Sequence, residues 1–183
     1  MAITPAKIPY LQGGRERCLP GCALLFQGVS LLEEAIENWG GLSHCACIVG
    51  PDIRIGSTEP TTIEALAGGL TPRLVATDCQ GPGRFFLFTP DDLTPAKQQA
   101  FVSWLVNRML LGTPYAYNQL LENAAGHVQE SIGQEFCSEA WGLAAEHAGI
   151  LRLPQNQSTL APRPGDVPVW WPGSMIELVG PFK

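Results

Sequence analysis

The chain has 183 residues, a formal net charge of −6, 45% hydrophobic residues and 15% charged residues. This length predicts a single domain over residues 1–183, large enough to bury a core without disulfide bonds or a metal ion. The composition is typical of a globular protein and excludes a disordered chain. The acidic balance argues against nucleic acid or an anionic membrane surface as the main partner. The longest apolar runs fall short of the ~20 residues that a transmembrane segment needs.

The N-terminus lacks the charged-then-apolar layout of a signal peptide, so we expect a cytoplasmic protein unless export follows a signal-independent route. In that compartment the cysteines are expected to be reduced, and Cys18, Cys22, Cys45 and Cys47 are expected to be buried and inert. The six cysteines are Cys18, Cys22, Cys45, Cys47, Cys79 and Cys137. The first four could supply thiolates to a zinc ion, although their spacing is not that of a common zinc knuckle. We therefore expect no metal and no other cofactor.

The first half of the chain predicts two strands before a turn and a third strand after it. Residues 1–18 are rich in Gly, Pro and charge, which indicates an irregular lead-in. The apolar run Ala23–Phe26 predicts a short buried strand. Ser30–Glu33 has a capping-box pattern that opens a short helix. His44–Val49 predicts the next strand, and after a Gly-Pro-Asp turn Ile53–Ile55 predicts its hairpin partner.

The second half of the chain predicts strands followed by two longer helices. Arg73–Ala76 and Arg84–Phe88 have strand patterns on either side of a Gly-Pro-Gly turn. Residues 94–112 predict a helix with a threonine cap at its start and a glycine at its end. A helix is predicted from about Gln134 to His147, with an alanine-rich face that suits close packing. Val167–Trp171 predicts a final edge strand. The fold class is therefore α+β, with a mainly antiparallel sheet packed against helices.

Two short segments far apart in the chain carry the residues of a cysteine-histidine site. Cys137 stands at the start of a predicted helix, where the helix dipole and a nearby imidazolium would stabilise a thiolate. His147 cannot be that imidazolium, because ten residues of one helix place it roughly 15 Å along the axis. The base must come from upstream, and His44, at the mouth of an apolar strand, is the best-placed candidate. The sequence predicts a Cys-His enzyme in which the histidine comes first.

The order and spacing of six segments support the same interpretation. They read PGCALLF, GLSHCACIVG, IGSTEP, LGTPYAYNQLL, EFCSEAWGLAAEHAGI and RPGDV. Over roughly residues 19 to 170 the chain resembles the circularly permuted NlpC/P60 proteins, also called permuted papain-like or YaeF/YiiX-type amidases. The resemblance implies a permuted papain-like fold and a cysteine peptidase or amidase. In such an enzyme Cys137 is the nucleophile and His44 is the general base.

The third member of the site is predicted from the segment after the histidine strand. The family places a polar residue there, often Glu, that accepts a hydrogen bond from the imidazole. Glu59 is the preferred candidate, because a carboxylate both fixes the tautomer and stabilises the imidazolium. A solvated Glu in a turn before Pro60 is the alternative interpretation. Glu64 and Asp52 are the other candidates for this position.

Three further residues are predicted at the substrate site. Tyr115 and Tyr117 match the family's aromatic block and would hydrogen-bond in the cleft, although packing after a helix explains them equally well. The backbone N–H of Cys137 or Ser138 could stabilise an oxyanion. The chain departs from the family at Cys22, where an Asp often follows the first Pro-Gly, and we interpret this as structural divergence.

Three functions follow from these residues. The first is a cysteine hydrolase that acts through an acyl-enzyme on a peptidoglycan peptide or another amide. The second is a lipid acyltransferase or phospholipase of the lecithin:retinol acyltransferase type, which shares the histidine-first order and usually has a membrane anchor. The third is a degenerate or zinc-bound module that binds a partner without catalysis. The expected partner is thus an amide- or acyl-containing substrate and not a nucleic acid. The sequence leaves the oligomeric state open.

Overall fold

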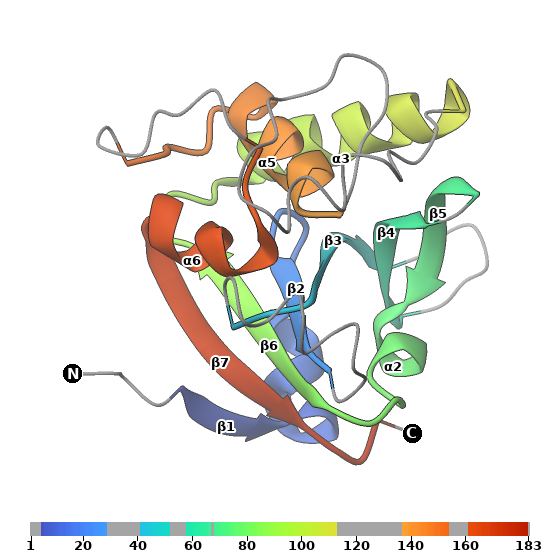
Figure 1. Ribbon diagram of the computed structural model, residues 1–183, viewed down its shortest axis with the longest axis vertical. Helices are drawn as coiled ribbons and strands as arrows, with labels where there is room; N and C mark the ends of the chain where they lie inside the picture. Colours follow the sequence, from blue (N-terminus) through green and yellow to red (C-terminus); the bar gives the residue numbers. More distant parts are fainter. Residues whose placement is uncertain are drawn as a thin grey trace.

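The computed structural model of the chain describes residues 5–28, 41–51, 58–66, 68–112, 137–153 and 161–182. Within these residues, seven strands form one sheet in the order β1-β7-β6-β2-β3-β4-β5 (Figure 1). All neighbouring strands are antiparallel except β1 and β7, which are parallel. The strands are β1 (Ala6–Pro9), β2 (Ala23–Gln27), β3 (His44–Pro51), β4 (Pro60–Leu66), β5 (Gly69–Leu74), β6 (Arg84–Pro90) and β7 (Gly173–Val179). The predicted α+β class and the mainly antiparallel sheet are confirmed.

Helices α3 and α5 pack against each other and cover one face of the sheet (Figure 1). The described helices and helical turns are η1 (Tyr10–Gly14), η2 (Arg15–Arg17), α2 (Val75–Asp78), α3 (Pro95–Leu110), α5 (Cys137–His147), η5 (Pro164–Asp166) and α6 (Val167–Trp170). The start of α3 is as predicted, because the Thr94 side chain accepts a hydrogen bond from the Lys97 N–H and Pro95 occupies the first turn. Its end is also as predicted, since Gly112 adopts a left-handed φ of 69°.

Two apolar clusters lie on opposite faces of the sheet, because successive strand residues point to opposite sides. On the face that α3 and α5 cover, the buried residues include Cys45 and Cys47 from β3 and Trp141 from α5. On the other face, the N-terminal turns and α2 cover a second cluster that includes Tyr10 and Val75. Both helices that position the site described below, α5 and α2, are therefore held by burial of apolar surface.

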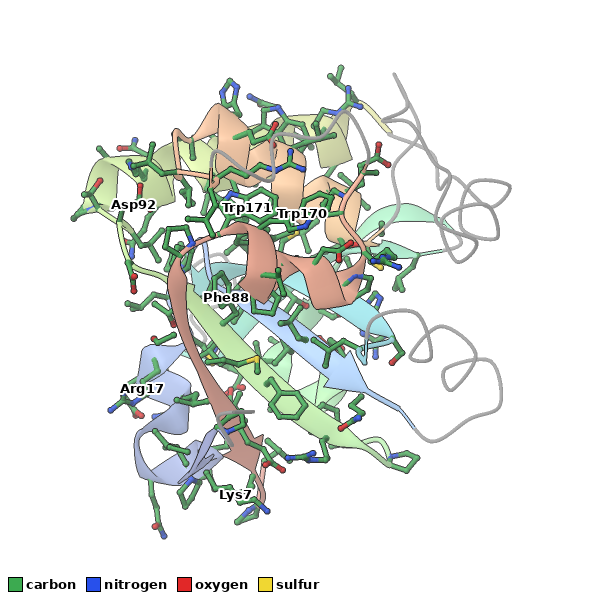
Figure 2. All side chains as sticks on the ribbon, turned by 60° about the vertical axis from the view of Figure 1, so that its left-hand side comes forward. Lys7, Arg17, Phe88, Asp92, Trp170 and Trp171 are labelled. Carbon is green, nitrogen blue, oxygen red and sulfur yellow. The ribbon has the colours of Figure 1, made fainter. Side chains whose placement is uncertain are left out.

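The largest aromatic cluster anchors α5 to the sheet and to α6. Trp141 is fully buried, and its ring makes edge-on contacts with Phe88 from β6 and with Trp171. Figure 2 shows Phe88, Trp170 and Trp171 where α5 and α6 approach the sheet. Because Trp141 is one helical turn beyond Cys137, this cluster also fixes the start of α5.

The structure corrects three predictions about the elements at the ends and in the middle of the chain. Residues 1–18 are not all irregular, because β1 adds to the sheet beside β7. The segment Arg73–Ala76 is not one strand, since β5 ends at Leu74 and α2 begins at Val75. Val167–Trp171 is mostly the helix α6, and the final strand β7 is internal, between β1 and β6. In the last two cases short apolar runs fit either a helix or a strand, and tertiary contacts decide.

The helix predicted at Ser30–Glu33, the strand predicted at Ile53–Ile55 and residues 134–136 lie outside the described residues. The strands predicted from Ala23, His44 and Arg84 are confirmed as β2, β3 and β6. Among the described residues, no helix is both long enough and apolar enough to span a membrane.

The Trp141 cluster predicts a large loss of stability on truncation. Trp141→Ala should lower the free energy of unfolding by about 3–5 kcal/mol, because it leaves a cavity among buried rings. Leu110→Ala is the control, since Leu110 is 76% exposed at the end of α3 and should change stability by less than about 0.5 kcal/mol. Urea unfolding followed by circular dichroism measures both variants. Equal effects would contradict the assigned burial.

Candidate active site

His44 is the first residue of β3. Its ring contacts residues from the two neighbouring strands, β2 and β4. Its Nε2 lies 2.9 Å from Oε2 of Glu64 on the neighbouring strand β4. Phe26, its partner in the β2–β3 register, packs against the imidazole with ring centroids 5.0 Å apart. The His44 side chain remains 25% exposed. The ring is thus held on two sides and is still open to solvent.

Cys137 is the first residue of α5, and its side chain is hydrogen-bonded to His44. Because Glu64 occupies Nε2 of the imidazole, Nδ1 is the ring nitrogen left for the sulfur. The sulfur also accepts hydrogen bonds from the backbone N–H groups of Cys45 and Ser138. Cys137 is only 4% exposed. The histidine and the cysteine, which are 93 positions apart in the sequence, therefore meet as the sequence predicts.

The electrostatics of this contact favour a thiolate beside an imidazolium. Burial by itself raises the pKa of the Cys137 thiol, but the charge of His44 and the hydrogen bonds to the sulfur lower it below its usual value. Burial by itself lowers the pKa of His44, but the negative sulfur and the Glu64 carboxylate raise it to about 10. An ion pair of this kind is what makes a cysteine nucleophilic near neutral pH.

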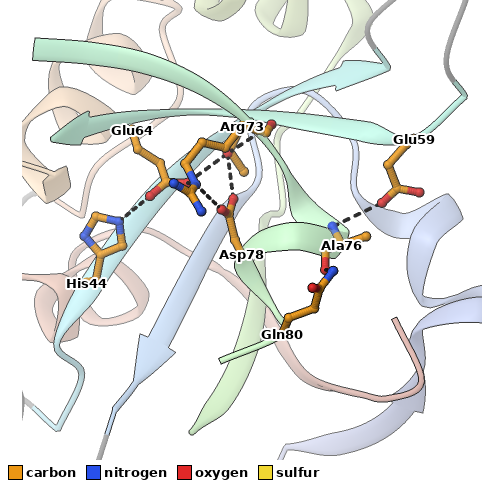
Figure 3. A network of polar contacts seen from close by, with 8 residues as sticks. His44, Glu59, Glu64, Arg73, Ala76, Asp78 and Gln80 are labelled. Carbon is orange, nitrogen blue, oxygen red and sulfur yellow. Dashed lines mark hydrogen bonds and ion pairs between the residues drawn. The ribbon is translucent and has the colours of Figure 1, made fainter. Parts of the chain in front are cut away.

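The carboxylate that holds His44 sits in a polar network of its own (Figure 3). Oε1 of Glu64 accepts from the Thr62 hydroxyl at 3.1 Å and lies 3.7 Å from Nε of Arg73. Asp78, on α2, hydrogen-bonds to Glu64 and forms an ion pair with Arg73. Burial raises the pKa of Glu64, yet the hydrogen bonds from His44 and Asp78 lower it below its usual value. Glu64 is thus ionised, and Thr62, Arg73 and Asp78 hold its carboxylate on the side away from His44.

Glu59, the predicted partner of His44, is placed elsewhere by the structure. Its carboxylate accepts hydrogen bonds from the Tyr10 hydroxyl and from the Ala76 backbone N–H, at 3.2 Å for the latter. Figure 3 shows Glu59 on the far side of the network from His44. The reason is that β4 begins at Pro60, so Glu59 precedes the strand while Glu64 lies within it beside β3. Glu64, the second candidate, takes the position predicted for Glu59.

Of the other predicted site residues, the structure describes only Ser138. The Ser138 hydroxyl is fully buried and donates to the carbonyl oxygen of Pro162, so it faces the protein, while its backbone N–H faces the Cys137 sulfur. Tyr115, Tyr117 and Asp52 lie outside the described residues.

The structure does not bring the four candidate zinc thiolates together. Cys45 and Cys47 point to the face of the sheet that α5 covers, whereas Cys18 and Cys22 belong to the cluster on the opposite face. Among the described residues, no group of three or more His, Cys, Asp and Glu side chains is arranged to hold a metal ion. None of the six cysteines forms a disulfide bond, and all six are buried.

Sequence reasoning missed three residues of the network, namely Thr62, Arg73 and Asp78. A signal for the first was present, because Thr62 and Glu64 alternate with Ile63 and Ala65, which is the period of a strand with one polar face. No sequence signal marked Asp78, since its place beside Glu64 depends on how α2 packs on β4 and β5.

The sequence matches no family model and no curated protein. A solved structure with a similar fold is that of the metalloprotein YiiX from Escherichia coli O157:H7, which carries the family label DUF1105. The two chains superpose with a TM-score of 0.56 over 89% of each chain, at 18% sequence identity. This chain has a YiiX-like fold. At such an identity the likeness concerns the fold alone.

The geometry around His44 predicts that only one of the two glutamates controls Cys137. At a pH below the lowered pKa of Cys137, where the thiolate fraction limits the rate, Glu64→Gln should slow alkylation of Cys137 by iodoacetamide by about tenfold, the effect of one pKa unit. Glu59→Gln removes a charge of the same kind from the same region and should leave the rate within about twofold. Mass spectrometry of the Cys137 peptide measures both rates. The reverse order of effects would contradict the assignment of Glu64.

The ion pair predicts an unusual pH dependence of the same alkylation. The lowered pKa of Cys137 means that the thiolate persists below the usual thiol range and is lost only as the pH falls through that lowered value. The raised pKa of His44 means that the imidazolium is lost as the pH rises through about 10. Between about pH 7 and about pH 9 the rate should change by less than about threefold, whereas an ordinary thiol loses about tenfold per unit below its pKa. His44→Ala should restore that steep dependence, and a steep wild-type profile would contradict the ion pair.

Proposed function

We propose that this protein is a cysteine hydrolase that cleaves an amide bond through an acyl-enzyme, with Cys137 as nucleophile, His44 as general base and acid, and Glu64 as the residue that orients His44. The observation that carries this proposal is the continuous hydrogen-bonded chain from the Cys137 sulfur through His44 to Glu64. A nucleophile, a base and a group that orients the base are the minimum set for covalent acyl transfer.

The proposed reaction proceeds in two halves. The Cys137 thiolate attacks the carbonyl carbon of the amide, and a tetrahedral intermediate with a negative oxygen forms. The backbone N–H groups of Cys45 and Ser138 face the sulfur, and we assign to them the stabilisation of that oxygen. His44 gives its proton to the leaving amine, and the C–N bond breaks to leave a thioester. Water then attacks the thioester, His44 takes the water's proton, and the carboxylic acid and the Cys137 thiolate are released.

Glu64 contributes orientation and charge in this scheme. It accepts the hydrogen bond from Nε2, which holds Nδ1 toward the sulfur and favours the protonated ring. The side chain of Glu64 is only 5% exposed, so little water competes for this contact. The carboxylate itself does not exchange a proton with the substrate.

The order of these elements supports a permuted papain-like fold of the NlpC/P60 type as part of the proposal. The histidine strand β3 precedes the cysteine helix α5 in the chain, and the resemblance stated above has the same order. The proposed substrates are therefore peptidoglycan peptides or other amides.

The YiiX structure is described as that of a metalloprotein. Within the described residues of this chain, no set of three or more His, Cys, Asp and Glu side chains could hold a metal ion. The described residues thus do not fit a metal centre, and each step above uses only protein groups and water.

Incubation with two substrate classes tests the proposal. Wild-type protein should release soluble fragments from purified peptidoglycan, and Cys137→Ala should lower that release by a factor of about 100 or more, because the nucleophile is lost. Ser43→Ala is the control, since Ser43 precedes His44 but its hydroxyl donates to the Phe26 carbonyl oxygen. Mass spectrometry of the products identifies the bond that is cleaved.

The alternatives have distinct outcomes in the same experiment. Release of fatty acid from phospholipid vesicles by the wild type alone would favour a lipid acyltransferase or phospholipase. No turnover of either substrate, together with a Cys137 that is no more reactive than the other cysteines, would contradict the enzyme proposal and favour a binding module.

A further inference from the structure

Asp78 lies beside the site without touching the residues that would meet a substrate. It is the last residue of α2, and its side chain is only 3% exposed. The charged and polar groups that face it are Glu64 and Thr62 from β4, Arg73 from β5 and the next residue in the chain, Cys79. Two buried carboxylates, Asp78 and Glu64, are thus in hydrogen-bond contact.

The hydrogen bonds of Thr62 show that this cluster needs one more proton. Its Oγ1 lies 3.1 Å from Oε1 of Glu64, 2.9 Å from Oδ2 of Asp78 and 3.4 Å from the carbonyl oxygen of Arg73. A hydroxyl has a single hydrogen to donate, whereas ionised carboxylates and carbonyls only accept. If both acids were ionised, oxygen lone pairs would face one another in a buried site. A proton on one of the two acids removes this conflict.

Counting charges leads to the same conclusion. The His44 imidazolium is matched by the Cys137 thiolate, so it does not neutralise the pair of acids. Arg73, which is 42% exposed, is the cation in contact with both Glu64 and Asp78. With both acids ionised, a buried negative charge would remain without a cation among the described residues, which is unfavourable in a buried site.

Of the two acids, Asp78 is the one that keeps the proton. Glu64 is held ionised by the hydrogen bond from His44, whereas Asp78 has no imidazolium partner among its described contacts. Burial, followed by the hydrogen bond and the charge of Glu64, raises the pKa of Asp78 to about 7. The ion pair with Arg73 acts in the opposite direction without cancelling the shift.

We propose that Asp78 is a positioning residue that keeps its proton up to about neutral pH and donates a hydrogen bond to Glu64, which fixes the carboxylate that orients His44. This inference rests on the proposed function for its consequence, because Glu64 matters only if His44 serves Cys137. When Asp78 loses its proton, a donor to Glu64 disappears and two negative charges repel each other. His44 is then held less firmly, so the activity of the site falls as the pH rises through the titration of Asp78.

The test compares wild type with Asp78→Asn, whose amide keeps a donor next to Glu64 at every pH. Alkylation of Cys137 by iodoacetamide is measured for both from about pH 6 to about pH 8. The ratio of the wild-type rate to the variant rate should fall by roughly threefold, the effect of half a pKa unit on a rate set by the thiolate fraction. A ratio that is constant or rises with pH would overturn the proposal. A merely structural role of Asp78 would change the rates without changing this slope.

Asp91→Asn is the matched control, because Asp91 is exposed in the turn before α3. The ratio of the wild-type alkylation rate to the Asp91→Asn rate should not vary with pH.

A second measurement uses the wild type alone and does not require a variant to fold. In protein with carbon-13-labelled aspartate carboxyl groups, the nuclear magnetic resonance signal of Asp78 should titrate near pH 7. A signal that is already ionised at about pH 5, as for an ordinary aspartate, would overturn the proposal.

These readouts separate the two proposals. A Cys137 no more reactive than the other thiols, beside an Asp78 signal that titrates near pH 7, would remove the enzyme proposal and with it the positioning role. A reactive Cys137 whose rate ratio stays constant with pH would remove the role of Asp78 and leave the enzyme proposal standing.

Discussion

The contact between the Cys137 sulfur and the His44 imidazole depends on stabilising two charges at the edge of a buried core. Burial disfavours both ions, so each must gain more from its neighbours than it loses from water. The sulfur gains from the imidazolium and from two backbone N–H groups, and the imidazolium gains from the sulfur and from Glu64. Because these gains require short contacts, the positions of β3, β4 and α5 are all constrained by this one pair.

The architecture meets that constraint by packing apolar surface on both faces of the sheet. On one face, Trp141 and its aromatic neighbours fix the helix that begins at Cys137. On the other, α2 packs against β4 and β5 and brings Asp78 to Glu64. The polar network therefore lies between two rigid layers. Cys137 from α5 and Glu64 from β4 both contact His44 at the start of β3, and Asp78 from α2 contacts Glu64.

Local patterns predicted the parts of the fold in which propensity and burial agree. The short apolar runs with aromatic residues that begin at Ala23 and Arg84 are strands, and the capped segment that begins at Pro95 is a helix. The runs that begin at Arg73 and Val167 were assigned incompletely or incorrectly, because a few apolar residues fit a strand or a helix equally well. In both places, contacts with distant segments select the observed conformation.

The sequence by itself predicted a pair between a histidine at a strand end and a cysteine at a helix start, and helix geometry excluded His147 as the partner. Only the tertiary structure decided that Glu64 and not Glu59 supports the histidine, since the strand beside β3 is β4, which begins after Glu59 and contains Glu64. The same holds for Asp78, whose contact with Glu64 joins two elements that no local pattern connects. The residue type and its local element can be predicted from the sequence, whereas the contacts between charged side chains on different elements depend on how the sheet and helices pack.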